Sequence, residues 1–173
     1  MSDMPVEVVR STRRKRTIQA SIVGGRIRVL VPAGLKPDEE RRLVESMVAR
    51  VSKKREAGSI DLAARARRLA DRYGLPIPKA IDWSDRQNQR WGSCTPADGT
   101  VRISNRLAGI PEWVLDYVLV HELAHLAHPG HNGQFRELVA RYELGERAEG
   151  YLIAKSEDGM TSPWGQADHT EAN

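Results

Sequence analysis

The sequence HELAHLAHPGH, residues 121–131, holds four of the five histidines of the chain. Residues four apart on a helix point the same way, about 6 Å apart along the axis. His121 and His125 can therefore both reach one metal ion. Glu122 flanks the pair on the edge of the helix, where its carboxylate can accept a proton from water. The stretch thus predicts a metal site carried by a helix.

Two imidazoles hold zinc poorly, so a third ligand is expected, and both His128 and His131 are candidates. A continuing helix would put His128 about 10 Å along the axis from His121, too far to share an ion. Pro129 biases the residue before it away from helical geometry, and Gly130 permits a sharp turn. The chain can then fold back, and we favour His131 over His128.

The sequence around these histidines predicts two helices. The first runs from Pro111 to about His128 and is apolar on nearly all sides, which is typical of a central, buried helix. Asn132 can cap a second helix that continues to about Tyr142. The apolar stripe of this second helix would hold the turn between the two against the core.

The N-terminal third of the chain predicts a small sheet followed by helices. Strands are expected at 6–9, 18–22 and 26–31, with a hairpin turn at Gly24-Gly25. A helix should begin at Pro37 and bury an apolar stripe formed by Leu43, Val44, Met47, Val48 and Val51.

A second helix and further strands are expected downstream. Ser59 is the predicted N-cap of this helix and Gly74 its C-terminal cap residue. Extended segments follow at 80–83, 90–94 and 100–104, the last two joined by a turn that ends in Asp-Gly.

These elements predict an α+β fold. An N-terminal β-hairpin sheet and a small antiparallel sheet would pack on about four helices, with the metal-binding helix in the centre. We expect one domain over residues 1–155, composed of a β part (1–35), a helical part (36–74) and a catalytic part (75–155). A polar flexible tail, residues 156–173, should follow.

The composition of the chain excludes several classes of protein. It has 173 residues, of which 40% are hydrophobic and 29% charged, as in a globular protein. A single cysteine excludes an internal disulfide framework and a cysteine-rich zinc site. No apolar run approaches the roughly 20 residues of a membrane span. The N-terminus lacks the apolar segment of a secretory signal, so a cytoplasmic location is expected.

Charge is unevenly distributed along the chain. The net charge is +4, but residues 142–173 hold seven acids and two bases, which leaves +9 on residues 1–141. Such an excess attracts polyanions without selecting among them. We interpret it as a solvated surface, and the basic segment RSTRRKR at 10–16 as a solvated turn. Nucleic acid is therefore a weakly supported partner.

The segment 90–142 resembles the YgjP-like family of zinc metallopeptidases. The family shows an R-W-G-S-C segment, a short hairpin, Y-V-x-x-H-E-L-x-H, a third His and a Phe. This sequence has RWGSC at 90–94, YVLVHELAH at 117–125, then His131 and Phe135. The resemblance is most specific in this part and extends over most of residues 6–153.

This resemblance implies a zincin-type α+β fold and a defined site. One Zn²⁺ would be held by His121, His125 and His131, with Glu122 as catalytic base. By analogy with zincins, strand 101–104 would form the rim of a cleft in which a peptide adds as a further strand. Tyr142, Asn132 and Arg90 are open candidates for the stabiliser of the oxyanion.

The function expected from these features is hydrolysis of peptide bonds by metal-activated water, with peptides or proteins as substrates. One alternative is an SprT-like protease that acts on DNA-bound proteins. Another is a non-catalytic interaction module stabilised by zinc, against which Glu122 argues, because a closed structural site needs no base.

Overall fold

The computed structural model describes residues 4–87 and 89–156. The chain divides into two compact units, residues 1–56 and 57–173. The single domain over residues 1–155 stays a prediction. The predicted flexible tail, residues 156–173, lies outside the described residues apart from Ser156.

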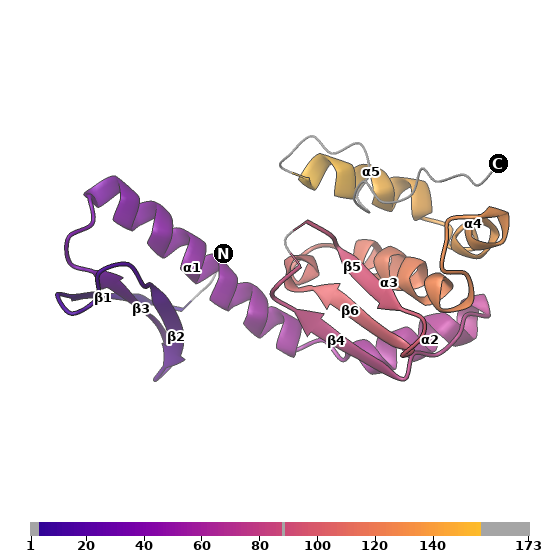
Figure 1. Ribbon diagram of the computed structural model, residues 1–173, viewed down its shortest axis with the longest axis horizontal. Helices are drawn as coiled ribbons and strands as arrows, with labels where there is room; N and C mark the ends of the chain where they lie inside the picture. Colours follow the sequence, from indigo (N-terminus) through magenta and orange to yellow (C-terminus); the bar gives the residue numbers. More distant parts are fainter. Residues whose placement is uncertain (1–3, 88, 157–173) are drawn as a thin grey trace. The chain divides into compact units, whose positions relative to one another are not determined.

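The first unit is a three-stranded sheet with a long helix (Figure 1). Strand β3 lies in the centre, antiparallel to β2 and parallel to β1. Gly24 and Gly25 form the β2–β3 turn and both have positive φ, 56° and 76°, which glycine adopts without strain. The elements are β1 (Val6–Ser11), β2 (Gln19–Val23), β3 (Arg26–Pro32) and α1 (Pro37–Gly58).

The alternation of side chains between the two faces of β3 explains how α1 packs on this sheet. Ile27, Val29 and Val31 point to one face of the sheet and are fully buried. Apolar side chains of α1 pack on them and confirm most of the predicted helical stripe. These side chains are Val44, Met47, Val48 and Val51.

The second unit contains a second three-stranded sheet and four α-helices among its described residues (Figure 1). Its strands are β4 (Ala80–Ser84), β5 (Gly92–Thr95) and β6 (Thr100–Ser104). A 3₁₀ turn (Asn105–Leu107) follows β6. The helices are α2 (Leu62–Tyr73), α3 (Glu112–Ala127), α4 (Gly133–Val139) and α5 (Gly145–Lys155).

The α+β class is confirmed, but the second sheet is mixed rather than antiparallel. Its order is β4-β6-β5, with β6 antiparallel to β5 and parallel to β4. After β4 the chain crosses to the opposite edge, and the β5–β6 hairpin then places β6 beside β4. The strand expected to form the rim of a cleft, 101–104, is therefore central, and β5 is an edge strand of this sheet.

Helix α2 begins later than predicted. Its N-cap is Asp61 and not Ser59, because the Asp61 carboxylate accepts a hydrogen bond from the backbone N–H of Ala64 at 2.9 Å. The predicted end is confirmed, since Gly74 has a φ of 65° and its N–H donates to the carbonyl of Ala70.

Helix α3 is the central element of the second unit. It contacts α2, α4, α5, β5 and β6, and its residues 117–124 are all buried. This confirms the prediction of a buried helix. Helix α5 was not predicted separately, because only Ala148 and Leu152 of its residues are buried and its pattern is weak. None of the helices in the described ranges combines the length and the apolarity needed to cross a bilayer.

Candidate metal centre

Three histidines converge at the C-terminal end of α3. The Nε2 atom of His121 lies 3.2 Å from Nε2 of His125 and 3.4 Å from Nε2 of His131. The three residues each offer a ligand atom within 4.8 Å of the others. Within residues 4–87 and 89–156 they are the one group of three or more His, Cys, Asp or Glu side chains with this property, and His128 is not part of it.

The turn after α3 places His131 beside the other two. The helix ends at Ala127, and His128 is extended, with φ −132° and ψ 100°. Helix α4 then starts directly, because the Asn132 side chain accepts a hydrogen bond from the Phe135 N–H at 2.9 Å. The Arg136 guanidinium donates to the carbonyl of His131 at 2.8 Å. The cap and this bond together hold His131 in place.

A single aromatic ring packs against all three imidazoles. The buried Phe135 ring stacks on His125 with centroids 4.4 Å apart. It meets His131 and His121 edge to face at 4.7 and 5.0 Å. Rings held this way have little freedom to rotate, so Phe135 orients the three nitrogens. Phe135 was predicted to belong to the apolar stripe that holds the turn against the core, and its contact with the three imidazoles was not predicted.

The surroundings of His121 favour a neutral imidazole. His121 is buried, and burial lowers its pKa well below the usual value, with His125 and His131 lowering it further. The Nδ1 atom of His125 lies 3.2 Å from the carbonyl oxygen of His128. A carbonyl can only accept, so we assign the proton to Nδ1, which leaves the Nε2 lone pair of His125 available to a metal.

Glu122 lies next to this group and is only 3% exposed. Burial raises its pKa to about 8, although the positive charge of Arg90 lowers it. The side chain faces β5, where Gly92 is its immediate neighbour. Burial, with a smaller contribution from the charge of Glu122, also raises the pKa of Cys94 to about 11. Cys94 does not belong to the histidine group.

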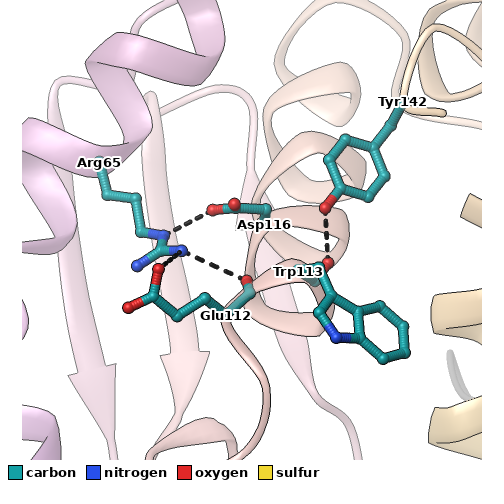
Figure 2. A network of polar contacts seen from close by, with 5 residues as sticks. All are labelled: Arg65, Glu112, Trp113, Asp116 and Tyr142. Atoms are coloured by element: carbon teal, nitrogen blue, oxygen red, sulfur yellow. Dashed lines mark hydrogen bonds and ion pairs between the residues drawn. The ribbon is translucent and has the colours of Figure 1, made fainter. Parts of the chain in front are cut away.

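Two of the three candidates for oxyanion stabilisation have other roles. The Tyr142 hydroxyl donates to the carbonyl of Trp113 at 2.8 Å, as Figure 2 shows. The Asn132 side chain caps α4. Arg90 is exposed, and its charge acts on Glu122. Arg90 is thus the candidate whose side chain remains available.

An ion-pair network fixes α3 to α2 (Figure 2). Arg65 of α2 donates to the Asp116 carboxylate at 2.5 Å and to the Glu112 carboxylate at 3.1 Å. It also reaches the backbone carbonyl of Glu112 at 3.3 Å. The side chains of Arg65 and Asp116 are 12% and 22% exposed, so water competes little for the bond between them, whereas the Glu112 side chain is exposed. The helix that carries the histidines is therefore anchored at its N-terminal end.

Comparison with known proteins agrees with this geometry. Residues 26–143 match the sequence model described as YgjP-like, metallopeptidase domain. The chain belongs to the YgjP-like family. As a YgjP-like protein it is a metal-dependent peptidase, a hydrolase that acts on peptides or proteins. The predicted resemblance and enzyme class are confirmed.

One solved structure shows partial similarity to this YgjP-like chain. It is the crystal structure of the metallopeptidase zymogen of Pyrococcus abyssi abylysin, at 19% identity and a TM-score of 0.48. The matched region covers 53% of the present chain and 91% of the other. No curated protein matches the chain.

Proposed function

We propose that the protein is a zinc-dependent peptidase in which His121, His125 and His131 hold one Zn²⁺ and Glu122 is the general base. The proposal rests on one observation. Three imidazole nitrogens converge within 4.8 Å of one another, and the residue after His121, Glu122, is a buried carboxylate. The cytoplasm stays the predicted compartment.

The donor set fits zinc in a catalytic site. Neutral imidazole nitrogens are common zinc ligands, and three protein ligands leave a position open for water or substrate. Zinc held by these three histidines would lower the pKa of bound water toward about 7 and polarise the substrate carbonyl. Other divalent ions also accept such ligands, so the identity of the metal is part of the proposal.

Glu122 would carry the proton during hydrolysis. Its carboxylate accepts a proton from the attacking water, holds it at one oxygen and passes it to the leaving amine. Burial raises the pKa of Glu122 above its usual value in the metal-free protein, which increases the proton affinity of its carboxylate. The apolar surroundings on α3 also limit competing water.

Strand β5 offers a place for the substrate backbone. It is an edge strand of its sheet and carries Gly92, the neighbour of Glu122. An extended peptide that pairs with this edge would lie beside the carboxylate. This placement replaces the one expected from strand 101–104, which is central.

The test is Glu122→Gln, which preserves the shape of the side chain and removes its basicity. Parent and variant are loaded with zinc, and each is incubated with a complex peptide mixture whose cleavage is followed by mass spectrometry. We expect equal zinc content and a loss of cleavage of about 100-fold or more in the variant. Cleavage at the parental rate by Glu122→Gln would exclude the assigned role.

The ligand set has its own test. His131→Ala should lower zinc content, measured by elemental analysis of the purified protein, while His128→Ala should retain it. Parental zinc content in His131→Ala would remove this residue from the site. An additional protein ligand, seen as a closed four-coordinate zinc by X-ray absorption, would favour the non-catalytic module.

A further inference from the structure

Strand β5 approaches Glu122 more closely than any residue with a side chain would permit. A Cβ atom built on Gly92 would lie 2.5 Å from Oε1 of Glu122, 2.7 Å from Cγ and 2.8 Å from Cδ. Carbon atoms at van der Waals contact are about 3.5–4.0 Å apart. The carboxylate therefore occupies the space that a side chain at position 92 would take.

The backbone at this position does not itself require glycine. Gly92 is not among the residues with positive φ, so another amino acid could adopt its conformation. Gly92 is the first residue of β5, and a glycine in a strand often marks a close approach of another group. The close approach here is the side chain of Glu122.

Glu122 cannot easily make room for a larger residue. The predicted clash includes Cγ as well as the carboxylate, so rotation of the terminal group would not relieve it. The χ1 angle would have to change, and on a helix few χ1 values are allowed. Helix α3 is packed on several sides, which prevents a compensating shift of its backbone.

We propose that Gly92 is a positioning residue. Because Gly92 has no side chain, Glu122 can occupy the space beside β5 and adopt the orientation in which it acts. The contribution of Gly92 to catalysis rests on the proposed function, in which Glu122 is the base. The steric dependence of the Glu122 side chain on Gly92 does not rest on that function. The two parts can thus be measured separately.

The steric part is tested by a double-mutant cycle of stability. Urea unfolding is compared for the zinc-loaded parent, Gly92→Ala, Glu122→Ala and the double variant. We expect Gly92→Ala to lower the unfolding midpoint in the parent and to lose most of this effect when Glu122 is Ala. Gly150→Ala is the matched control, since outside its chain neighbours and the nearby backbone of α5 no atom lies within 4 Å of its added Cβ, and its midpoint should not fall.

The catalytic part is tested with a peptide that the parent cleaves. Gly92→Ala should retain the zinc content of the parent, while kcat falls about 100-fold and KM changes by less than about threefold. A merely structural role would reduce the amount of folded, zinc-loaded protein and leave the kcat of that fraction unchanged.

Three results would overturn the proposal. One is parental kcat in Gly92→Ala, and another is an equal midpoint shift in both Glu122 backgrounds. The third applies if Gly92→Ala does not fold. The double variant should then be as stable as Glu122→Ala alone, and a double variant that also fails to fold would overturn the proposal. Full activity of Glu122→Gln would instead refute the proposed function and leave the stability cycle valid.

Discussion

Among the single residues of the site, Phe135 has the widest set of contacts with the histidines. Its ring touches each of the three imidazoles, while its backbone N–H donates a hydrogen bond to the Asn132 side chain. The same residue thus links the start of α4 to the orientation of the ligands. Metal affinity should depend on this ring although it supplies no ligand atom.

Phe135→Leu should weaken zinc binding about tenfold, because groups that orient metal ligands contribute about 10–100-fold to affinity. A titration against a chromophoric chelator measures the dissociation constant. Leu138→Met, a conservative change on the same helix, should bind zinc like the parent. An unchanged dissociation constant in Phe135→Leu would show that the ring does not orient the imidazoles.

The alkylation rate of the Cys94 thiol depends on how far burial raises its pKa. With a pKa of about 11, only about one thiol in a thousand is ionised at pH 8. In the zinc-free protein, alkylation by iodoacetamide should be slow at pH 8 and should rise about tenfold per pH unit up to pH 10. The urea-unfolded chain is the control, with a plateau expected near pH 9. A plateau there in the folded protein would contradict the raised pKa.

Among the elements, α3 depends on α2 for its position. Arg65, whose side chain is mostly buried, joins the two helices through the partly buried carboxylate of Asp116 and the exposed carboxylate of Glu112. Removing Arg65 leaves the carboxylates of Asp116 and Glu112 without their charge partner. The pairing therefore affects both stability and the placement of the histidines further along α3.

Arg65→Ala should lower the free energy of unfolding by about 2 kcal/mol, since hydrogen bonds to charged groups contribute about 1.5–3 kcal/mol. Urea denaturation measures this change. Arg67→Ala is the control, because Arg67 is exposed on the same helix, and its effect should stay within about 0.5 kcal/mol. Equal effects of the two substitutions would refute the anchoring role of Arg65.

At the level of the whole molecule, the two units differ in charge. Residues 1–56 contain 14 Lys or Arg and 7 Asp or Glu, a net charge of +7, which leaves −3 on residues 57–173. The histidines and Glu122 all belong to the second unit. Arg13, Lys15 and Arg16 of the first unit are exposed, but no aromatic side chain accompanies them to stack on bases.

We therefore expect single-stranded DNA to leave the rate of peptide cleavage unchanged at about 150 mM salt, where exposed charges are largely screened. Cleavage of the selected peptide is measured with and without DNA, and binding is measured over a salt series. Stimulation by DNA that is lost in a variant with Arg13, Lys15 and Arg16 changed to Ala would favour the DNA-associated protease instead.

Local patterns were sufficient to predict much of the fold. The period of the apolar residues defined α1, a nearly continuous apolar run defined α3, the glycines at 24, 25 and 74 marked turns and a helix end, and Asn132 marked the start of α4. Each of these features depends on residues close together in the chain. The N-cap at Ser59 was wrong because two nearby side chains could serve as a cap, and only Asp61 is adjacent to the first helical residue.

The sequence by itself determined that histidines four residues apart share one face of a buried helix, and it indicated that the chain could fold back after His128. Only the tertiary structure decided the strand order β4-β6-β5, and with it the contact of Gly92 with Glu122. Pairing of distant strands depends on how the chain crosses the sheet, which no local spacing encodes. The packing of Phe135 on all three imidazoles likewise requires two helices to meet.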